Sequence, residues 1–134
     1  MNIVQKLFLP KPKRIILDFI DQHQDSVQYT RTKETGSFIT TTVFIEADNM
    51  ILRASLQNDI FFHPSMAHSI LPTKVSYSFQ CTHTCNDNEC IFNQTPVICE
   101  AQINKKESKF PLLVYNTMMD YYYMKMNDAI NNVK

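Results

Sequence analysis

Four cysteines and one histidine are the side chains in this sequence best suited to chemistry. Cys81, Cys85, Cys90 and Cys99 follow the spacing C-x3-C-x4-C-x8-C, and His83 lies between the first two. Thiolate and imidazole are the usual ligands of zinc, and the ligands of a structural zinc site generally come in close pairs along the chain. The candidate cofactor is therefore a structural zinc ion held by the four cysteines, with His83 able to replace one of them.

A second interpretation of the same cysteines needs no metal. The two C-x2-C pairs of common zinc motifs are absent, and Cys81 and Cys99 lie in stretches where apolar and polar residues alternate. They would then be small core side chains, while Cys85 and Cys90 would be incidental thiols of the loop between them. The missing pairs favour this second interpretation.

The sequence contains no recognisable catalytic motif. A nucleophilic cysteine needs a base beside it and a third group that orients the base. His83 is two residues from both Cys81 and Cys85, and Asp87 and Glu89 follow it. Proximity within a loop defines no relative geometry, so we predict that the protein is not an enzyme.

Composition and charge exclude several classes of nucleotide-binding protein. Gly36 is the only glycine, whereas phosphate-binding loops of the Walker and Rossmann types need several. The formal net charge is zero, with six basic and three acidic residues over 1–33, so the overall basic charge of non-specific nucleic-acid binders is missing. A local basic cluster remains as a candidate phosphate-binding site, and it consists of Lys6, Lys11, Lys13 and Arg14.

No targeting or membrane segment is recognisable. The only apolar run near the start is short, and it is bounded by Lys6 and Pro10. A signal peptide needs about 7–15 apolar residues and a membrane span about 20. We therefore expect an intracellular protein, cytoplasmic or nuclear, without membrane contact. In that compartment the cysteines would be thiols or metal ligands rather than disulfides.

Alternating apolar and polar residues predict that the cysteines are carried by a β-hairpin. The arms are expected at 75–81 and 97–104, because both have the period-2 pattern of a half-buried strand. If the arms pair, Cys81 and Cys99 face the same side of adjacent strands, and we expect their side chains to approach closely.

The other elements follow from the same periodicities. A helix is expected at 12–22, strands at 27–33, 37–46 and 50–56, an irregular segment at 60–72, and a long helix at about 111–131. The strand at 37–46 is apolar on both faces, which predicts an interior strand covered on both sides. Asp48 and Asn49 predict a two-residue turn, because both tolerate positive φ. We predict a single α+β domain, 1–134, with an antiparallel sheet of four or five strands on which the N-terminal and C-terminal helices pack.

The last helix is the predicted interaction surface. Apolar residues recur at alternating spacings of three and four, which predicts one buried stripe: Leu112, Tyr115, Met119, Tyr122, Met126, Ala129 and Val133. Successive residues of a helix point about 100° apart, so the tyrosine run and the neighbouring methionines cannot all be buried on that stripe. We assign partner binding to Met118, Tyr121, Tyr122, Tyr123 and Met124. The alternative is that the domain hides most of this helix.

Two functions from different classes are consistent with these patterns. The favoured one is a non-enzymatic protein-interaction module, an adaptor or subunit of a larger intracellular complex, which binds another protein or itself through the Met/Tyr helix. The other is a nucleic-acid-associated domain that contacts phosphates through its basic N-terminal segment, with a structural zinc in the cysteine hairpin.

Overall fold

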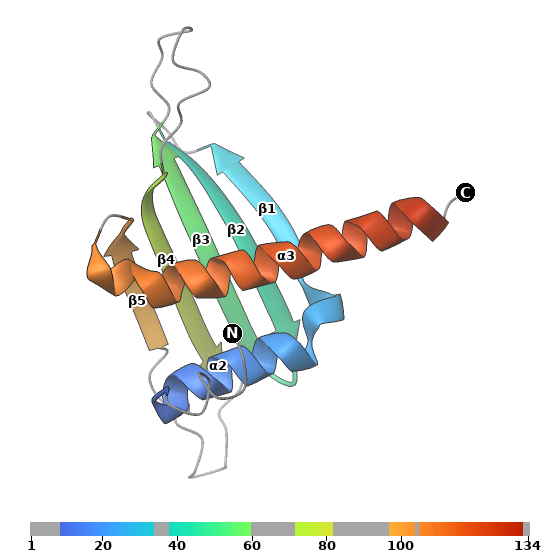
Figure 1. Ribbon diagram of the computed structural model, residues 1–134, viewed down its shortest axis with the longest axis horizontal. Helices are drawn as coiled ribbons and strands as arrows, with labels where there is room; N and C mark the ends of the chain where they lie inside the picture. Colours follow the sequence, from blue (N-terminus) through green and yellow to red (C-terminus); the bar gives the residue numbers. More distant parts are fainter. Residues whose placement is uncertain (1–8, 34–37, 60–71, 82–96, 104, 133–134) are drawn as a thin grey trace, which may run out of the picture.

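The computed structural model describes residues 9–33, 38–59, 72–81, 97–103 and 105–132. Five strands form one antiparallel sheet in the order β1-β2-β3-β4-β5. The strands are β1 (Gln28–Lys33), β2 (Phe38–Ala47), β3 (Met50–Asp59), β4 (Pro72–Cys81) and β5 (Val97–Gln102). The helices are α2 (Lys11–Gln22) and α3 (Lys109–Asn132), with the short 3-10 helices η1 (Gln24–Ser26) and η3 (Lys106–Ser108). The predicted α+β fold, with both helices packed on the sheet, is confirmed (Figure 1).

Helix α2 buries the apolar stripe that its sequence predicts. A proline occupies its first turn, where the missing N–H costs no hydrogen bond. Ile16, Phe19 and Ile20 are buried as expected, and Leu17 is buried with them. The ring centroid of Phe19 lies 5.0 Å from that of Phe79 in β4. The stripe therefore anchors α2 to the sheet near the C-terminal end of β4 (Figure 1).

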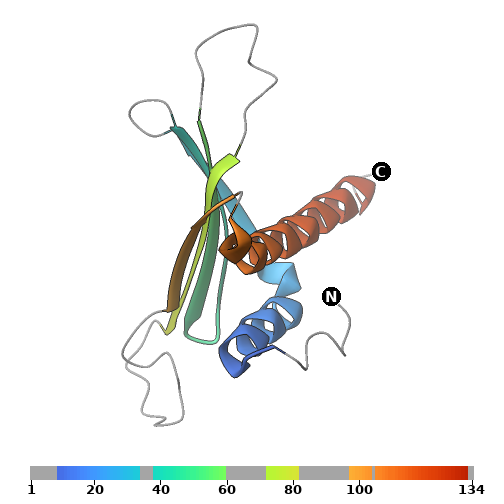
Figure 2. The same ribbon diagram turned by 60° about the vertical axis from the view of Figure 1, so that its left-hand side comes forward.

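Both described long helices, α2 and α3, lie on the same face of the sheet (Figure 2). Val43 of β2 and Leu52 of β3 are fully buried and belong to the core cluster that also contains the buried residues of both helices. On the opposite face the hydroxyl groups of Thr42 and Ser55 lie 2.8 Å apart across the same two strands. The prediction that the 37–46 strand is covered on both sides is therefore wrong, because β2 is interior to the sheet but, among the described elements, meets helices on one face only. Its threonines reflect the preference of β-branched residues for strands rather than burial.

The connection between β2 and β3 is the predicted two-residue turn. Asp48 and Asn49 have φ values of 53° and 62°, and Ala47 pairs with Met50 on either side of them. Positive φ at both central positions is characteristic of hairpin turns whose twist matches that of the flanking strands. The turn thus sets the register of the two central strands.

Helix α3 buries a broader side than the predicted stripe. Its buried positions are Phe110, Pro111, Val114, Tyr115, Met118 and Met119. They recur as adjacent pairs four residues apart, which makes a band wide enough to lie across several strands. The predicted stripe is buried only in the first part of the helix: Tyr115 and Met119 are buried, whereas Tyr122 is half-buried and Met126 is exposed.

Two core tyrosines should make the fold sensitive to alkaline pH. Burial raises the pKa of Tyr77 to about 12, with a smaller contribution from Cys99, and burial likewise raises the pKa of Tyr115 to about 12. A folded-state pKa above the unfolded value of about 10 means that each neutral phenol stabilises the fold below about pH 10, and that this stabilisation is lost as the pH rises towards 12.

We therefore expect the urea midpoint of unfolding to fall between about pH 9 and about pH 12. The matched control is the double variant Tyr77→Phe/Tyr115→Phe, which keeps both rings but cannot ionise at these positions. Its midpoint should fall less over the same pH range. An equal fall in both proteins would show that these two phenols do not cause the alkaline loss.

Candidate interaction surface

The C-terminal part of α3 extends beyond the sheet. The helix crosses the covered face and continues past the edge strand β1, so no described strand lies beneath its end (Figure 1). A helix of 24 residues is about 36 Å long, whereas five strands about 4.8 Å apart span roughly 20 Å. The helix is thus longer than the sheet is wide.

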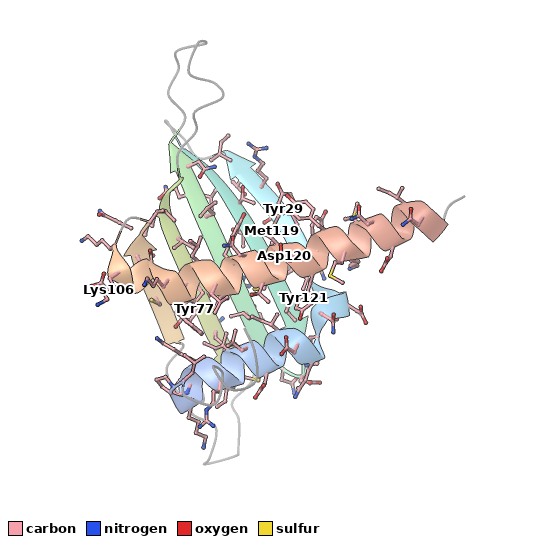
Figure 3. The ribbon with its side chains drawn as sticks, in the orientation of Figure 1. Tyr29, Tyr77, Lys106, Met119, Asp120 and Tyr121 are labelled. Atoms are coloured by element: carbon pink, nitrogen blue, oxygen red, sulfur yellow. The ribbon has the colours of Figure 1, made fainter. Side chains whose placement is uncertain are left out.

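Three side chains within little more than one turn of α3, ending at Lys125, contact the rest of the fold where the helix passes the edge of the sheet. The Tyr121 hydroxyl donates a hydrogen bond to the Asp21 carboxylate of α2 at 3.0 Å, and Figure 3 places Tyr121 on the α2 side of α3. The Tyr122 ring stacks on Tyr29 of β1 with ring centroids 5.2 Å apart. Lys125 Nζ lies 3.5 Å from a backbone carbonyl oxygen just before β1. These contacts position the helix as it passes the edge of the sheet.

The large hydrophobic side chains that are exposed in the described part of the chain all lie in the projecting end of α3, residues 123–132. Tyr123 and Ile130 are each 58% exposed, Met124 is 56% exposed and Met126 is 42% exposed. Single exposed hydrophobic residues are normal on protein surfaces, but their concentration on one segment is typical of an interaction site. The projecting end is therefore the candidate interaction surface.

Three of these side chains share one side of the helix. At about 100° per residue, Tyr123, Met126 and Ile130 fall within roughly 60° of one another around the helix axis. We call these three residues the Tyr–Met–Ile stripe. Met124 points about 100° away from Tyr123, so it lies outside the stripe although it is equally exposed.

The structure separates the five residues that were predicted to bind a partner. Met118 is fully buried in the core, so its assignment to an exposed partner surface is wrong: it faces the sheet where α3 still crosses it. Tyr121 and Tyr122 are half-buried against α2 and β1. Tyr123 and Met124 are exposed, and their role in binding stays a prediction.

Sequence reasoning missed Met126 and Ile130 as surface residues. Met126 was placed in the buried stripe because the three-and-four spacing continues unbroken to the end of the helix. The available signal was the length of the helix, because an α3 of this length cannot be covered by a sheet of five strands. The spacing of apolar residues predicts which side of a helix is apolar. The length of the helix, compared with the width of the sheet, predicts where the helix stops being covered.

The two strand cysteines do not approach each other as expected. The register of β4 and β5 pairs Cys99 with Tyr77, which is four residues before Cys81 on β4, a separation of about 13 Å along the strands. Zinc–sulfur bonds are about 2.3 Å long, so these two cysteines cannot bind the same zinc ion in this register. The expected close approach is therefore wrong, and Cys85, Cys90 and His83 lie outside the described residues.

No group of three or more histidine, cysteine, aspartate or glutamate side chains among the described residues is placed to hold a metal ion. Zinc binding by the cysteine hairpin stays a prediction. If a zinc ion is present, the described register assigns at most one of the two strand cysteines to it.

The predicted phosphate-binding residues do not form one face in the part of the chain that is described. Lys11 is exposed, whereas Lys13 Nζ lies over the ring of Phe110, 4.9 Å from its centroid. Arg14 is half-buried, and Lys6 lies outside the described residues. Lys11 and Lys13 point about 160° apart around α2. Nucleic-acid binding by this cluster stays a prediction, and the described geometry offers it no continuous basic surface.

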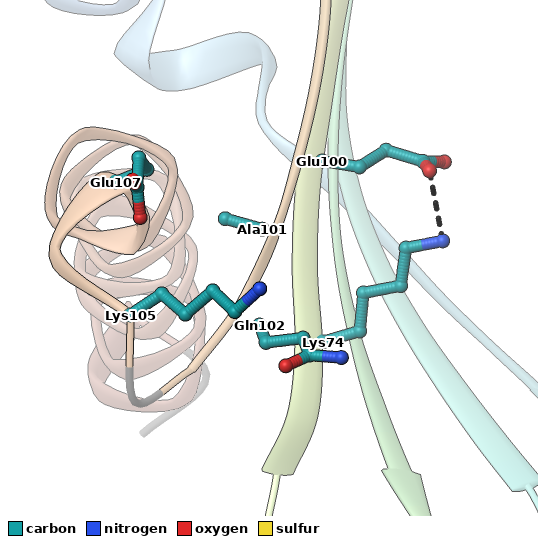
Figure 4. A pocket seen from close by; sticks show the side chains of 6 residues that line it. All are labelled: Lys74, Glu100, Ala101, Gln102, Lys105 and Glu107. Carbon is teal, nitrogen blue, oxygen red and sulfur yellow. Dashed lines mark ion pairs between the residues drawn. The ribbon is translucent and has the colours of Figure 1, made fainter.

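A charged pocket of about 460 Å³ lies around β5 at the other edge of the sheet. Lys74 and Glu100 form an ion pair of 2.9 Å on one side of the strand, and Lys105 and Glu107 line the other side (Figure 4). The two charged groups of the ion pair are each about half exposed, so water screens them and the pair contributes little binding energy. Among the described residues that line the pocket, none is a cysteine or histidine and none carries a hydroxyl group.

None of the helices in the described ranges is both long enough and apolar enough to span a bilayer. Comparisons with protein-family models, with curated proteins and with solved structures give no match.

Proposed function

We propose that the chain is a non-enzymatic protein-interaction module, an adaptor or subunit of a larger complex, that binds its partner through the projecting end of α3. One observation carries this proposal: the exposed large hydrophobic side chains of the described chain are concentrated on a helix segment that the sheet does not support. Methionine and tyrosine are both enriched at protein interfaces.

Partner binding gives this segment the burial that its own fold does not provide. Moving one fully exposed large apolar side chain from water into an interface contributes about 1.5–3 kcal/mol to binding. A side chain that is partly buried in the free protein contributes less, in proportion to the area that is still exposed. Tyr123 and Ile130 are each more than half exposed, so each retains most of this contribution for binding. A short helical segment held only at one end also gains order when a partner packs on it.

The test compares two charge-introducing variants of the same segment. In Tyr123→Glu/Ile130→Glu both ends of the Tyr–Met–Ile stripe become charged, and the affinity for the partner should fall by about 100-fold or more, because two buried apolar contacts are replaced by two carboxylates. In the control variant Asn131→Glu the new charge stands about 100° from Ile130, outside the Tyr–Met–Ile stripe, and the affinity should be unchanged.

The measurement uses the partner that co-purifies with the native chain, identified and then titrated as a purified protein by calorimetry. If the native complex contains only copies of the chain, the titration is replaced by the dissociation constant of that assembly. Circular dichroism should show the same helix content in both variants as in the original chain. Unchanged affinity in the stripe variant would contradict the proposal.

A further inference from the structure

The outer edge of β1 is open in the described structure. β1 pairs with β2 along its whole length without a register shift, and no described strand pairs with its other side. Gln28, Thr30, Arg31 and Thr32 are exposed. The strand carries two charged residues that disfavour edge pairing, Arg31 and Lys33, but neither the proline nor the bulge that would block it. The edge can therefore accept another strand.

The projecting end of α3 extends beyond this same edge. Ten residues of helix measure about 15 Å, which equals about three strand spacings. In Figure 1 the projecting end lies past β1 on the helix-covered side of the sheet. A strand that paired with β1 would thus lie beneath the projecting end of α3. The five strands of the sheet lie beneath the first part of α3 in the same way.

The direction of the Tyr–Met–Ile stripe gives the position of the partner. Tyr121 bonds to α2, and at 100° per residue the three stripe residues point about 140–200° away from Tyr121. The stripe therefore faces away from α2. Because Tyr122 stacks on Tyr29, α3 passes over the N-terminal end of β1, and the stripe faces along β1 towards its C-terminal end.

We infer that the partner is a second copy of this chain, joined about a two-fold axis by antiparallel β1–β1 pairing and by antiparallel packing of the two projecting α3 ends. This inference rests on the proposed function and names its partner. A two-fold axis perpendicular to the joined sheet keeps both α3 helices on the same face and reverses their directions. The α3 of the second copy then passes over the C-terminal end of the first β1, where the stripe of the first copy faces it.

The charges of β1 favour one of two neighbouring registers for this pairing. Cross-strand neighbours must lie on the same face, so the axis passes through a residue of β1. With Thr30 on the axis, Arg31 of one copy lies opposite Tyr29 of the other, which is a favourable cation–π pair. With Arg31 on the axis, two arginines would lie directly opposite each other, which is destabilising. The register centred on Thr30 is therefore favoured.

Neither the β1–β1 pairing nor the packing of the two α3 ends is expected to hold the dimer together alone. A stable interface buries about 800 Å² per partner, and the three partly exposed side chains of the Tyr–Met–Ile stripe cannot supply that area alone. The β1 edge adds backbone hydrogen bonds and the contact between the joined sheet and the two helix ends. A charge on the stripe should thus weaken the whole dimer, although it leaves β1 unchanged.

The first experiment measures the mass of the full chain in solution by sedimentation equilibrium at concentrations up to about 100 μM. The original chain should be dimeric, and Tyr123→Glu/Ile130→Glu should raise the dimer dissociation constant by at least about 100-fold. Asn131→Glu is the matched control, because Asn131 is exposed and points about 100° away from Ile130, outside the Tyr–Met–Ile stripe. It should leave the dissociation constant unchanged.

The second experiment tests the strand register by disulfide trapping. In the Thr30-centred register two Thr30 residues are directly opposite, so Thr30→Cys should form an intermolecular disulfide on oxidation. Thr32→Cys is the control, because two Thr32 residues would be about 13 Å apart and beyond the reach of a disulfide. The original chain, with its native cysteines, sets the background. A dimer that Thr30→Cys does not link overturns the β1 pairing.

A monomeric chain at all concentrations overturns the inference and has a different consequence for the proposed function. If Tyr123→Glu/Ile130→Glu still abolishes binding to a different, purified partner, the interaction surface stands and only its occupant is wrong. If the stripe variant changes no association at all, both the dimer and the proposed function are wrong.

Discussion

Replacing Met118 by glutamate should leave the chain unfolded under conditions where the original protein is folded. Met118 is fully buried, and an ionised carboxylate without a partner in the core costs several kcal/mol. That cost is comparable with the whole stability of a typical domain, about 5–15 kcal/mol. The expected result is loss of the folded circular dichroism signal and of a cooperative urea transition.

The matched control for this prediction is Met124→Glu, the same substitution six residues later on the same helix. Met124 is 56% exposed, so the new carboxylate stays in water and the urea midpoint should change little. A graded variant, Met118→Ala, should remain folded and lose about 2–5 kcal/mol of unfolding free energy. A folded Met118→Glu protein with an unchanged midpoint would show that Met118 is not core.

Replacing Phe79 by alanine should cost about 3–5 kcal/mol of unfolding free energy, because a large buried ring leaves a cavity that the fold cannot close. Phe79 is fully buried in β4, where it pairs with Leu52 of β3 and its ring centroid lies 5.0 Å from that of Phe19 in α2. It thus links the sheet to the first helix. Urea denaturation at a constant slope measures the loss.

The neighbouring residue provides the control for Phe79. Ser78 is half-buried and, one position along the strand, points to the face without helices. Ser78→Ala should change the unfolding free energy by no more than about 0.5 kcal/mol. Equal losses in Phe79→Ala and Ser78→Ala would mean that the two faces of β4 contribute alike, which contradicts the described packing.

The sequence by itself determined the elements whose evidence is local. The period-2 pattern around Tyr77 and Phe79 predicted strand β4 and its buried side, and both side chains are buried. Asp48 and Asn49 predicted a turn with positive φ, and both have it. These predictions hold because strand periodicity and turn conformation depend on residues that are adjacent in the chain.

Only the tertiary structure decided the relations between distant residues. The spacing of the cysteines allowed Cys81 and Cys99 to meet, but the register of β4 and β5 places Cys99 beside Tyr77. The connection between these strands is too long for a turn type to set their register, so the packing of alternate side chains sets it instead. Side-chain direction was predictable here, whereas position along the neighbouring strand was not.

The surface of α3 was decided in the same way. Its apolar spacing continues from Tyr115 to Met126 and beyond, yet Tyr115 is buried and Met126 is exposed. The amino-acid pattern is the same at both positions, and what differs is whether a strand lies beneath them. Burial is a property of the other elements that a side chain meets, so the end of the sheet at β1, and not the helix sequence, separates the core of this protein from its candidate interaction surface.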